Sequence, residues 1–200
     1  MTDKNTKHKT AMAKQKAKVD QNIAAAQTER GIVLLLTGDG KGKSSSAFGM
    51  VMRSLGYDYK VGVIQFIKGE QMSGEELFIR QHHPEVYFYQ MGTGFTWNTQ
   101  NREADIAAAE RTWEHAEKLL QDDSYHLIVL DELTYMIGYK YLDAEHIFKA
   151  IRERPAEQSV IITGRGGGSA LRELADTVAE INDVKHAFKA GIKARKGVDL

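Results

Sequence analysis

The densest group of potentially chemical residues in this chain lies between positions 37 and 46. This segment reads Thr37-Gly38-Asp39-Gly40-Lys41-Gly42-Lys43-Ser44-Ser45-Ser46 and follows the apolar run 31–36. Closely spaced glycines let successive backbone N–H groups face an anion, and a helix starting near Lys43 would add the partial positive charge of its N-terminus. Lys43 would reach the outer phosphates of a nucleotide, and the Ser44 hydroxyl would ligate magnesium. The segment is therefore predicted to be a phosphate-binding loop.

This loop departs from the pattern G-x-x-x-x-G-K-[ST] at its first position. Thr37 stands there instead of glycine, and glycines follow at positions 38 and 40. The path of the loop is therefore not fixed by the pattern, which leaves the pose of the nucleotide open. The predicted nucleotide-binding residues are Gly38, Asp39, Gly40, Lys41, Gly42, Lys43, Ser44 and Ser45.

Two acidic residues follow a second apolar run. The segment Leu127-Ile128-Val129-Leu130-Asp131-Glu132 is typical of a buried strand that ends in carboxylates. Ligands of parallel sheets gather outside the carboxyl ends of the strands, so these acids are expected beside the phosphate-binding loop. Because magnesium prefers hard oxygen ligands, Ser44 together with Asp131 or Glu132 is the predicted metal site, with contacts made directly or through water.

Two further loops carry residues with alternative interpretations. Arg165 lies in a glycine-rich turn after the apolar run 160–162, where a guanidinium would fork onto phosphate oxygens. The alternative is a flexible turn with a solvent-facing arginine. Phe95 and Trp97 lie in a glycine-flanked polar loop, which favours contact with a flat apolar ligand. They equally suit a loop that is folded onto the body by its own aromatic side chains.

Composition narrows the class of protein. A chain of 200 residues suits one domain, and its 27 basic and 27 acidic residues give no support to a large nucleic-acid footprint. The absence of cysteine excludes disulfides, thiolate metal sites and a cysteine nucleophile, and the seven histidines are too scattered to suggest a zinc site. No apolar run is long enough to span a membrane and no signal core is visible, so a cytoplasmic enzyme or ATPase is expected.

Beyond residue 30, apolar runs alternate with helical stretches. Strands are predicted at 31–37, 61–67, 86–91, 126–131, 159–163 and 177–181, and helices at 43–55, 75–82, 100–120, 133–139, 144–154 and 169–175. Nearly continuous apolar strands separated by helices imply right-handed crossovers and a sheet buried on both faces. The predicted fold is α/β, with a mostly parallel sheet of about six strands, helices on both faces, and a single nucleotide-binding domain over residues 31–200.

The two ends of the chain differ from the centre. Residues 1–30 form a polar, basic segment that is expected to be partly helical near residues 19–30, or mobile. It suits a solvated tail, or alternatively a segment that folds over an anionic site or a partner subunit. Residues 185–196 are basic with interleaved apolar residues, which suits either a solvated tail or a segment lying along an acidic or amide-rimmed ligand.

Several blocks of this sequence together resemble the P-loop type of ATP:corrinoid adenosyltransferase, the cob(I)yrinic acid a,c-diamide adenosyltransferase family. The blocks are 38–44, 62–69, the loop from Phe95 and Trp97 to 103–105, 129–135, 162–166 and 184–188, and the resemblance covers about residues 20–200. Thr37 in place of glycine is in keeping with this family. Ser44 stands where threonine is common, and the glycine run 166–168 is looser than the family pattern.

The resemblance implies a P-loop NTPase (RecA-like) fold and transfer of the 5′-deoxyadenosyl group of ATP to the cobalt(I) of a corrinoid, in adenosylcobalamin biosynthesis or salvage. Lys43 and Arg165 would stabilise the departing triphosphate. Phe95 and Trp97 would pack beneath the corrin ring and remove the axial ligand from cobalt(II). The resemblance also implies Mg²⁺ or Mn²⁺ with ATP, the corrinoid as co-substrate, a flavoprotein reductant and a homodimer.

Three other classes of protein remain as alternatives at this stage. The first is an ATPase or kinase of the same fold that cleaves a phosphoanhydride bond. The second is a RecA-like nucleic-acid-binding module, against which the zero net charge argues. The third is a nucleotide-binding regulatory protein without catalysis, which only the family resemblance disfavours.

Overall fold

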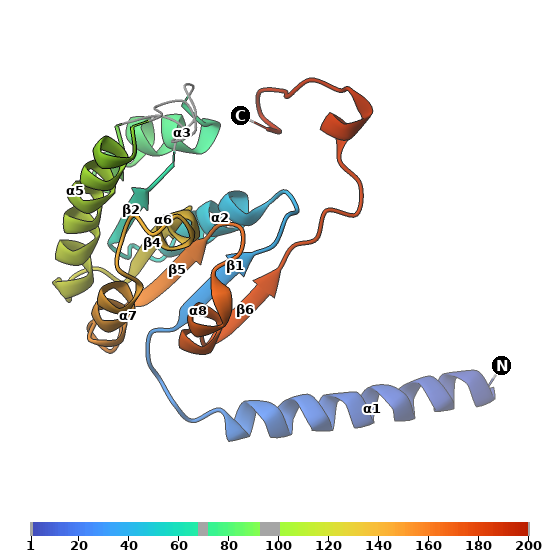
Figure 1. Ribbon diagram of the computed structural model, residues 1–200. Helices are drawn as coiled ribbons and strands as arrows, with labels where there is room; N and C mark the ends of the chain where they lie inside the picture. Colours follow the sequence, from blue (N-terminus) through green and yellow to red (C-terminus); the bar gives the residue numbers. More distant parts are fainter. Residues whose placement is uncertain (1, 68–71, 93–100, 200) are drawn as a thin grey trace.

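A six-stranded parallel sheet forms the centre of the molecule (Figure 1). The computed structural model describes residues 2–67, 72–92 and 101–199. The strands lie in the order β3-β2-β4-β5-β1-β6, and every neighbouring pair is parallel. Their bounds are β1 Val33–Thr37, β2 Val61–Gln65, β3 Tyr87–Gln90, β4 Leu127–Asp131, β5 Ser159–Thr163 and β6 Thr177–Glu180. The predicted α/β fold with about six parallel strands is confirmed.

Helices cover both faces of this sheet, as its apolar strands require. The helices of the body are α2 Lys43–Leu55, α3 Gly74–His82, α5 Arg102–Gln121, α6 Leu133–Gly138, α7 Ala144–Arg152 and α8 Gly168–Leu174. Leu34 and Leu36 of β1 pack in one core with residues of α2 and α3, whereas Leu35 points into the other core with residues of α5 to α8. Full burial of one such leucine contributes about 2 kcal/mol. Strands buried on both faces therefore hold the sheet between two helical layers.

The register of the strands brings their polar ends to one edge of the sheet. In the pairing of β2, Gln65 lies opposite Gln90 of β3 and Asp131 of β4. In the pairing of β1 with β5, Leu36 lies opposite Thr163, so Thr37 ends at the same edge. Each of these strands ends in a polar residue, and the carboxyl edge of the sheet is consequently polar.

The ends of the chain extend beyond this body. α1 (Thr2–Ala25) is exposed along its length and projects away from the sheet (Figure 1). Helix was expected only near residues 19–30, but it occupies the earlier residues and stops before 26; pairs such as Lys7 with Asp3, four residues apart, support the earlier turns. After β6, the segment containing the 3₁₀ helix η1 (Ala187–Ala190) curves back toward the carboxyl edge.

Within the described residues, no helix is both long enough and apolar enough to cross a bilayer.

Candidate nucleotide-binding site

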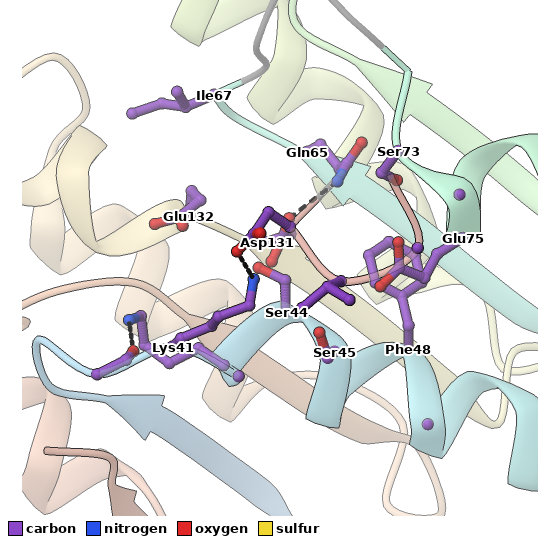
Figure 2. A pocket seen from close by; sticks show the side chains of 18 of the residues that line it. Lys41, Ser44, Ser45, Phe48, Gln65, Ile67, Ser73, Glu75, Asp131 and Glu132 are labelled. Carbon is purple, nitrogen blue, oxygen red and sulfur yellow. Dashed lines mark hydrogen bonds and ion pairs between the residues drawn. The ribbon is translucent and has the colours of Figure 1, made fainter. Parts of the chain in front are cut away.

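A cavity of about 880 Å³ opens at the carboxyl edge of the sheet (Figure 2). It lies between the loop after β1, the ends of β2 and β4, and the first turns of α3. Its lining includes Asp39, Gly40, Lys41, Gly42, Lys43, Ser44, Ser45, Gln65, Ser73, Glu75, Phe78, Asp131, Glu132, Tyr135, Arg165, His186 and Asp199. This volume is in the range of pockets that hold small-molecule ligands.

The predicted phosphate-binding loop forms one wall of this cavity. Gly42 has a φ of 119° and precedes the first residue of α2, Lys43. The Lys43 side chain is buried and donates a hydrogen bond to the Gly40 carbonyl at 2.8 Å. Burial lowers the pKa of its ammonium group, and the charge of Glu132 opposes that effect. The cation is thus held at the start of a helix, where an anionic ligand is favoured.

Ile181, the residue that follows β6, is hydrogen-bonded to the phosphate-binding loop. The Gly40 N–H donates to the Ile181 carbonyl at 2.7 Å, and the Ile181 N–H donates to the Thr37 carbonyl at 2.8 Å. The expectation that successive N–H groups face the ligand does not hold for Gly40, because its N–H is already bonded to the Ile181 carbonyl. At Gly38, with φ +98°, a Cβ would lie 2.4 Å from the Ile181 oxygen, so this contact requires glycine.

The two predicted acidic ligands have different surroundings. Asp131 is buried, and both of its carboxylate oxygens accept hydrogen bonds: Oδ1 from the Thr163 hydroxyl at 2.6 Å and Oδ2 from the Gln65 amide at 2.9 Å. Figure 2 shows Gln65, Asp131 and Ser44 around the same part of the cavity. Donors on both oxygens hold the carboxylate in one orientation.

Glu132 follows Asp131 in an unusual backbone conformation. Its φ of 61° is left-handed, and its N–H donates to the Thr163 hydroxyl at 2.9 Å. Its Oε2 is enclosed and has no hydrogen-bond partner in the described part of the chain. Burial, with the nearby Asp131 charge, raises the pKa of Glu132 to about 7, while the charges of Lys43 and Arg165 act in the opposite direction. A strained backbone and an unpartnered carboxylate oxygen are features of ligand sites.

Two threonine hydroxyls hold the loop that carries Arg165. The Thr37 hydroxyl donates to the Gly166 carbonyl at 2.8 Å, and the Thr134 hydroxyl donates to the Arg165 carbonyl at 2.9 Å. The Arg165 side chain is exposed and lies 4.0 Å from Asp39. Glycines with positive φ flank it on both sides, at 164 and at 166–168. The structure therefore brings Arg165 to the mouth of the cavity.

The segment after β6 closes part of the cavity mouth. Asp199 forms an ion pair with Lys41 of the phosphate-binding loop at 3.1 Å, and His186 also lines the cavity. Sequence analysis left the basic segment 185–196 as either a solvated tail or a segment lying along a ligand, and it did not identify Asp199 as a contact of the loop. An aspartate three residues beyond that segment gave no signal that it would pair with Lys41.

The structure thus gathers most of the predicted site residues in one place. Residues 39–45, Asp131, Glu132 and Arg165 line the cavity, and Gly38 supports it from beneath. Phe95 and Trp97 lie outside the described residues. Sequence analysis missed Gln65 and Thr163, which bond to Asp131; the available signal was that each ends an apolar strand at the ligand-binding edge.

The chemistry of the acidic corner fits a divalent cation. Ser44, Asp131 and Glu132 all line one cavity and supply hard oxygen donors, and one oxygen of the Glu132 carboxylate has no hydrogen-bond partner in the described part of the chain. In the described ranges there is no group of three or more His, Cys, Asp or Glu side chains arranged to hold a metal by themselves. A magnesium ion with few protein ligands, held together with phosphate oxygens, matches this donor set.

A glycine loop that opens a helix after β1, with acids at the end of β4, defines a P-loop nucleotide-binding protein. A solved structure with this fold is the flagellar accessory protein FlaH from Methanocaldococcus jannaschii, with a TM-score of 0.50 and 12% identity over 82% of this chain and 76% of that chain. At this level of identity the likeness concerns the fold alone.

Comparison of sequences identifies the family. The model of the family ATP:corrinoid adenosyltransferase BtuR/CobO/CobP matches residues 29–200. A corrinoid adenosyltransferase of Pseudomonas aeruginosa is 52% identical over 99% of this chain and 98% of that protein. Another, of Escherichia coli K12, is 53% identical over 92% of this chain and 93% of its own length. The chain belongs to the ATP:corrinoid adenosyltransferase family, and it is a transferase.

Proposed function

We propose that this protein transfers the 5′-deoxyadenosyl group of ATP to the cobalt(I) of a corrinoid and releases inorganic triphosphate. Family membership supports this reaction, and the observation that carries it in the structure is one cavity joining the phosphate-binding loop, the β4 acids and Arg165. The reaction belongs to the biosynthesis or salvage of an adenosylated corrinoid. The proposed location of the protein is the cytoplasm.

The reaction requires no nucleophile from the protein. Cobalt(I) of the substrate attacks the ribose C5′, a Co–C bond forms, and the C5′–O bond breaks with its electron pair leaving on the triphosphate. Among the described residues, no serine hydroxyl of the cavity is hydrogen-bonded to a histidine or carboxylate that would activate it. The lining suits stabilisation of a leaving group rather than covalent catalysis.

Lys43, Arg165 and the N–H groups at the start of α2 stabilise the charge that develops on the departing triphosphate. Lys43 is buried at that helix start, and Arg165 lies at the cavity mouth. A preorganised donor aimed at developing charge is worth roughly 3 kcal/mol of barrier. Ser44, with Asp131 and Glu132, would hold a Mg²⁺ or Mn²⁺ ion, which supplies further positive charge at the phosphates when bound.

Phe95 and Trp97 pack beneath the corrin ring and remove the axial ligand of cobalt(II), so that a flavoprotein can reduce it. The support is the family membership and the position of these aromatics in a polar, glycine-flanked stretch of the sequence. Phe95→Ala and Trp97→Ala are expected to keep ATP affinity while losing most adenosylation of cobalt(II) corrinoids under a flavoprotein reductant. Equal activity of both variants and the wild type under that reductant would contradict this assignment.

The terminal segments cover the amide-rimmed corrinoid, with the chain acting as a homodimer. For the C-terminal segment, the support is that η1 and the residues after it are exposed and reach the cavity mouth at Asp199. For the N-terminal segment, the support is that α1 is exposed along its length and free to reach a second chain. The measurement that tests the dimer is the mass in solution by light scattering.

The decisive experiment supplies ATP, magnesium and chemically reduced cobalamin. The expected result is the spectrum of a light-sensitive adenosylated corrinoid, with triphosphate as the second product. ADP and phosphate without a cobalt–carbon bond would instead identify an ATPase or kinase of the same fold.

A further inference from the structure

Polar side chains at the ends of three neighbouring strands form one continuous hydrogen-bonded chain. Gln65 of β2 lies in register with Gln90 of β3 on one side and with Asp131 of β4 on the other. The Gln90 amide nitrogen donates to Gln65 Oε1 at 2.6 Å, and the Gln65 amide nitrogen donates to Asp131 Oδ2 at 2.9 Å. The ladder of the parallel sheet therefore sets these three side chains side by side.

A buried acid of α3 fixes the outer end of this chain. Glu76 is 1% exposed, and its Oε2 accepts a hydrogen bond from the Gln90 amide nitrogen at 2.6 Å. Its Oε1 accepts from Arg80 at 2.9 Å, one turn further along the helix. Both N–H bonds of the Gln90 amide thus have acceptors, one on Glu76 and one on Gln65.

The order of donors and acceptors can run in only one direction. Glu76 at one end and Asp131 at the other are carboxylates, which accept hydrogen bonds when ionised. If the Gln90 amide were turned over, its carbonyl would face Glu76. If the Gln65 amide were turned over, its carbonyl would face Asp131 and its amino group would face that of Gln90. The network itself therefore assigns the orientation of both amides.

Gln90 acts at a distance from the cavity. Gln65 and Asp131 both line the cavity, whereas Gln90 does not. Among its contacts, Gln90 bonds to Gln65 on the inner side and to Glu76 on the outer side. Within this chain of hydrogen bonds, Gln90 reaches Asp131 through Gln65.

We propose that Gln90 is a positioning residue for Asp131. By holding the Gln65 carbonyl, it keeps the Gln65 amino group on Asp131 Oδ2, while the Thr163 hydroxyl holds Oδ1. The carboxylate is thereby kept in one orientation toward the cavity that it shares with Ser44. The inference deepens the proposed function, because it rests on Asp131 helping to hold the divalent cation that accompanies ATP.

Two variants of the full-length protein separate this role from a general effect on packing. Gln90→Leu removes both donors. The exchange variant Glu76→Gln with Gln90→Glu keeps the net charge and size, but its carboxylate at position 90 draws the Gln65 amino group away from Asp131. Gln81→Leu, at an exposed glutamine of α3, makes the same chemical change outside the chain of hydrogen bonds and is the matched control.

The readout is binding of Mn²⁺ to the protein–ATP complex, measured from the paramagnetic resonance signal of the free ion. Both test variants are expected to bind Mn²⁺ about tenfold more weakly, as loss of a partner of a metal ligand commonly causes. The affinity for ATP without a cation is expected to change less than about twofold, since the phosphate-binding loop is untouched. In the adenosylation assay, the magnesium concentration for half-maximal rate rises, while the rate at saturating magnesium stays close to that of the wild type.

Wild-type Mn²⁺ affinity in the exchange variant would overturn the proposal, as would an equal loss of cation-free ATP binding. If thermal unfolding shows that Gln90→Leu is not folded, the result for the exchange variant decides alone. Asp131→Asn tests the premise: unchanged Mn²⁺ affinity in that variant would overturn the role of Asp131 and with it that of Gln90. Failure of the wild type to adenosylate reduced cobalamin would instead contradict the proposed function itself, so the two failures are distinguishable.

Discussion

Thr37 occupies the position at which phosphate-binding loops commonly carry their first glycine. Its side chain is buried, and its hydroxyl donates to the Gly166 carbonyl in the loop that carries Arg165. A glycine could not make this bond. The unusual residue therefore ties two loops of the site together, one on β1 and one on β5.

Thr37→Val is expected to lower the adenosylation rate about tenfold, because Arg165 loses one support and small misplacements of charged groups are costly. The loss of unfolding free energy should be about 1 kcal/mol, since Gly166 is an exposed residue and this hydrogen bond is only partly buried. Steady-state kinetics and urea unfolding measure the two effects. Thr37→Ser keeps the hydroxyl and should behave as the wild type, and equal rates for the valine and serine variants would refute the role of this bond.

The sequence predicted that Asp131 and Glu132 would lie at the ligand-binding edge, but not that their hydrogen bonds and backbone conformations would differ. Asp131 and Glu132 are adjacent letters after an apolar run, and the same edge was expected for both. Only the pairing of β4 with β2 and β5 shows that Asp131 receives two donors, while Glu132 turns into a left-handed conformation with an unpartnered oxygen. These differences depend on neighbouring strands, which no single segment of sequence reveals.

At the scale of elements, two of the three glycines in the turn from β1 into α2 have a positive φ, and they are required for different reasons. Gly38 and Gly42 both have positive φ, at 98° and 119°. A Cβ at Gly38 would meet the oxygen of Ile181, the residue that follows β6, whereas a Cβ at Gly42 would have no atom within 4 Å. The first glycine is required by packing and conformation, and the second by conformation alone.

Gly38→Ala is accordingly expected to destabilise the protein more than Gly42→Ala. Conformational strain should cost about 1 kcal/mol at either position. The clash with β6 should add about 2 kcal/mol at Gly38. Urea unfolding without nucleotide measures both variants under the same conditions. Equal losses of unfolding free energy would show that the loop moves away from β6 without cost.

A second element-scale feature lies at the opposite end of β1. Asp176, just before β6, accepts hydrogen bonds from Arg30 and from the Val33 N–H, each at 2.9 Å. The hydrogen bond from Arg30, followed by that from Val33, lowers the pKa of Asp176 to about 2. A carboxylate with a lowered pKa stabilises the fold above its unfolded pKa, and this stabilisation is lost as the pH falls toward the folded value.

Asp176→Asn should therefore reduce the unfolding free energy near neutral pH and converge with the wild type between about pH 4 and pH 2. The difference at neutral pH should be about 1 kcal/mol, because the pair with Arg30 is partly solvent-screened. Urea titrations at several pH values measure it. Arg30→Gln should lose only part of this stabilisation, since the bond from Val33 remains. A difference that does not change with pH would contradict the assignment.

The elements themselves were largely predictable, because the central strands are apolar runs bounded by glycine or polar residues. All six predicted strands are present, and α2 spans the predicted residues 43–55. The order of the strands was not predicted, and the chain Gln90–Gln65–Asp131 depends on it. The bounds of α1 also differed from the prediction, because lysine, alanine and glutamine favour helix even without a surface to pack on.

At the scale of the whole molecule, α1 is expected to contribute little to the unfolding free energy of the sheet domain. The side chains of residues 3–25 are exposed, so the helix buries little against the body. Deletion of residues 2–25 is expected to change the unfolding free energy of the domain by less than about 0.5 kcal/mol. Urea unfolding followed by tryptophan fluorescence measures this, since α1 contains no tryptophan. A larger loss would indicate that α1 packs on the domain or on a second chain in solution.

β1 lies between β5 and β6, so its register partners come late in the chain. Val33 pairs with Val160, and Leu34 pairs with Thr177. During synthesis, the phosphate-binding loop thus leaves the ribosome long before the two strands that support it. Pairings over such distances form slowly, because loop closure must precede contact. The nascent chain is therefore expected to acquire nucleotide only after β6 has emerged, which makes ATP binding a marker of completed folding.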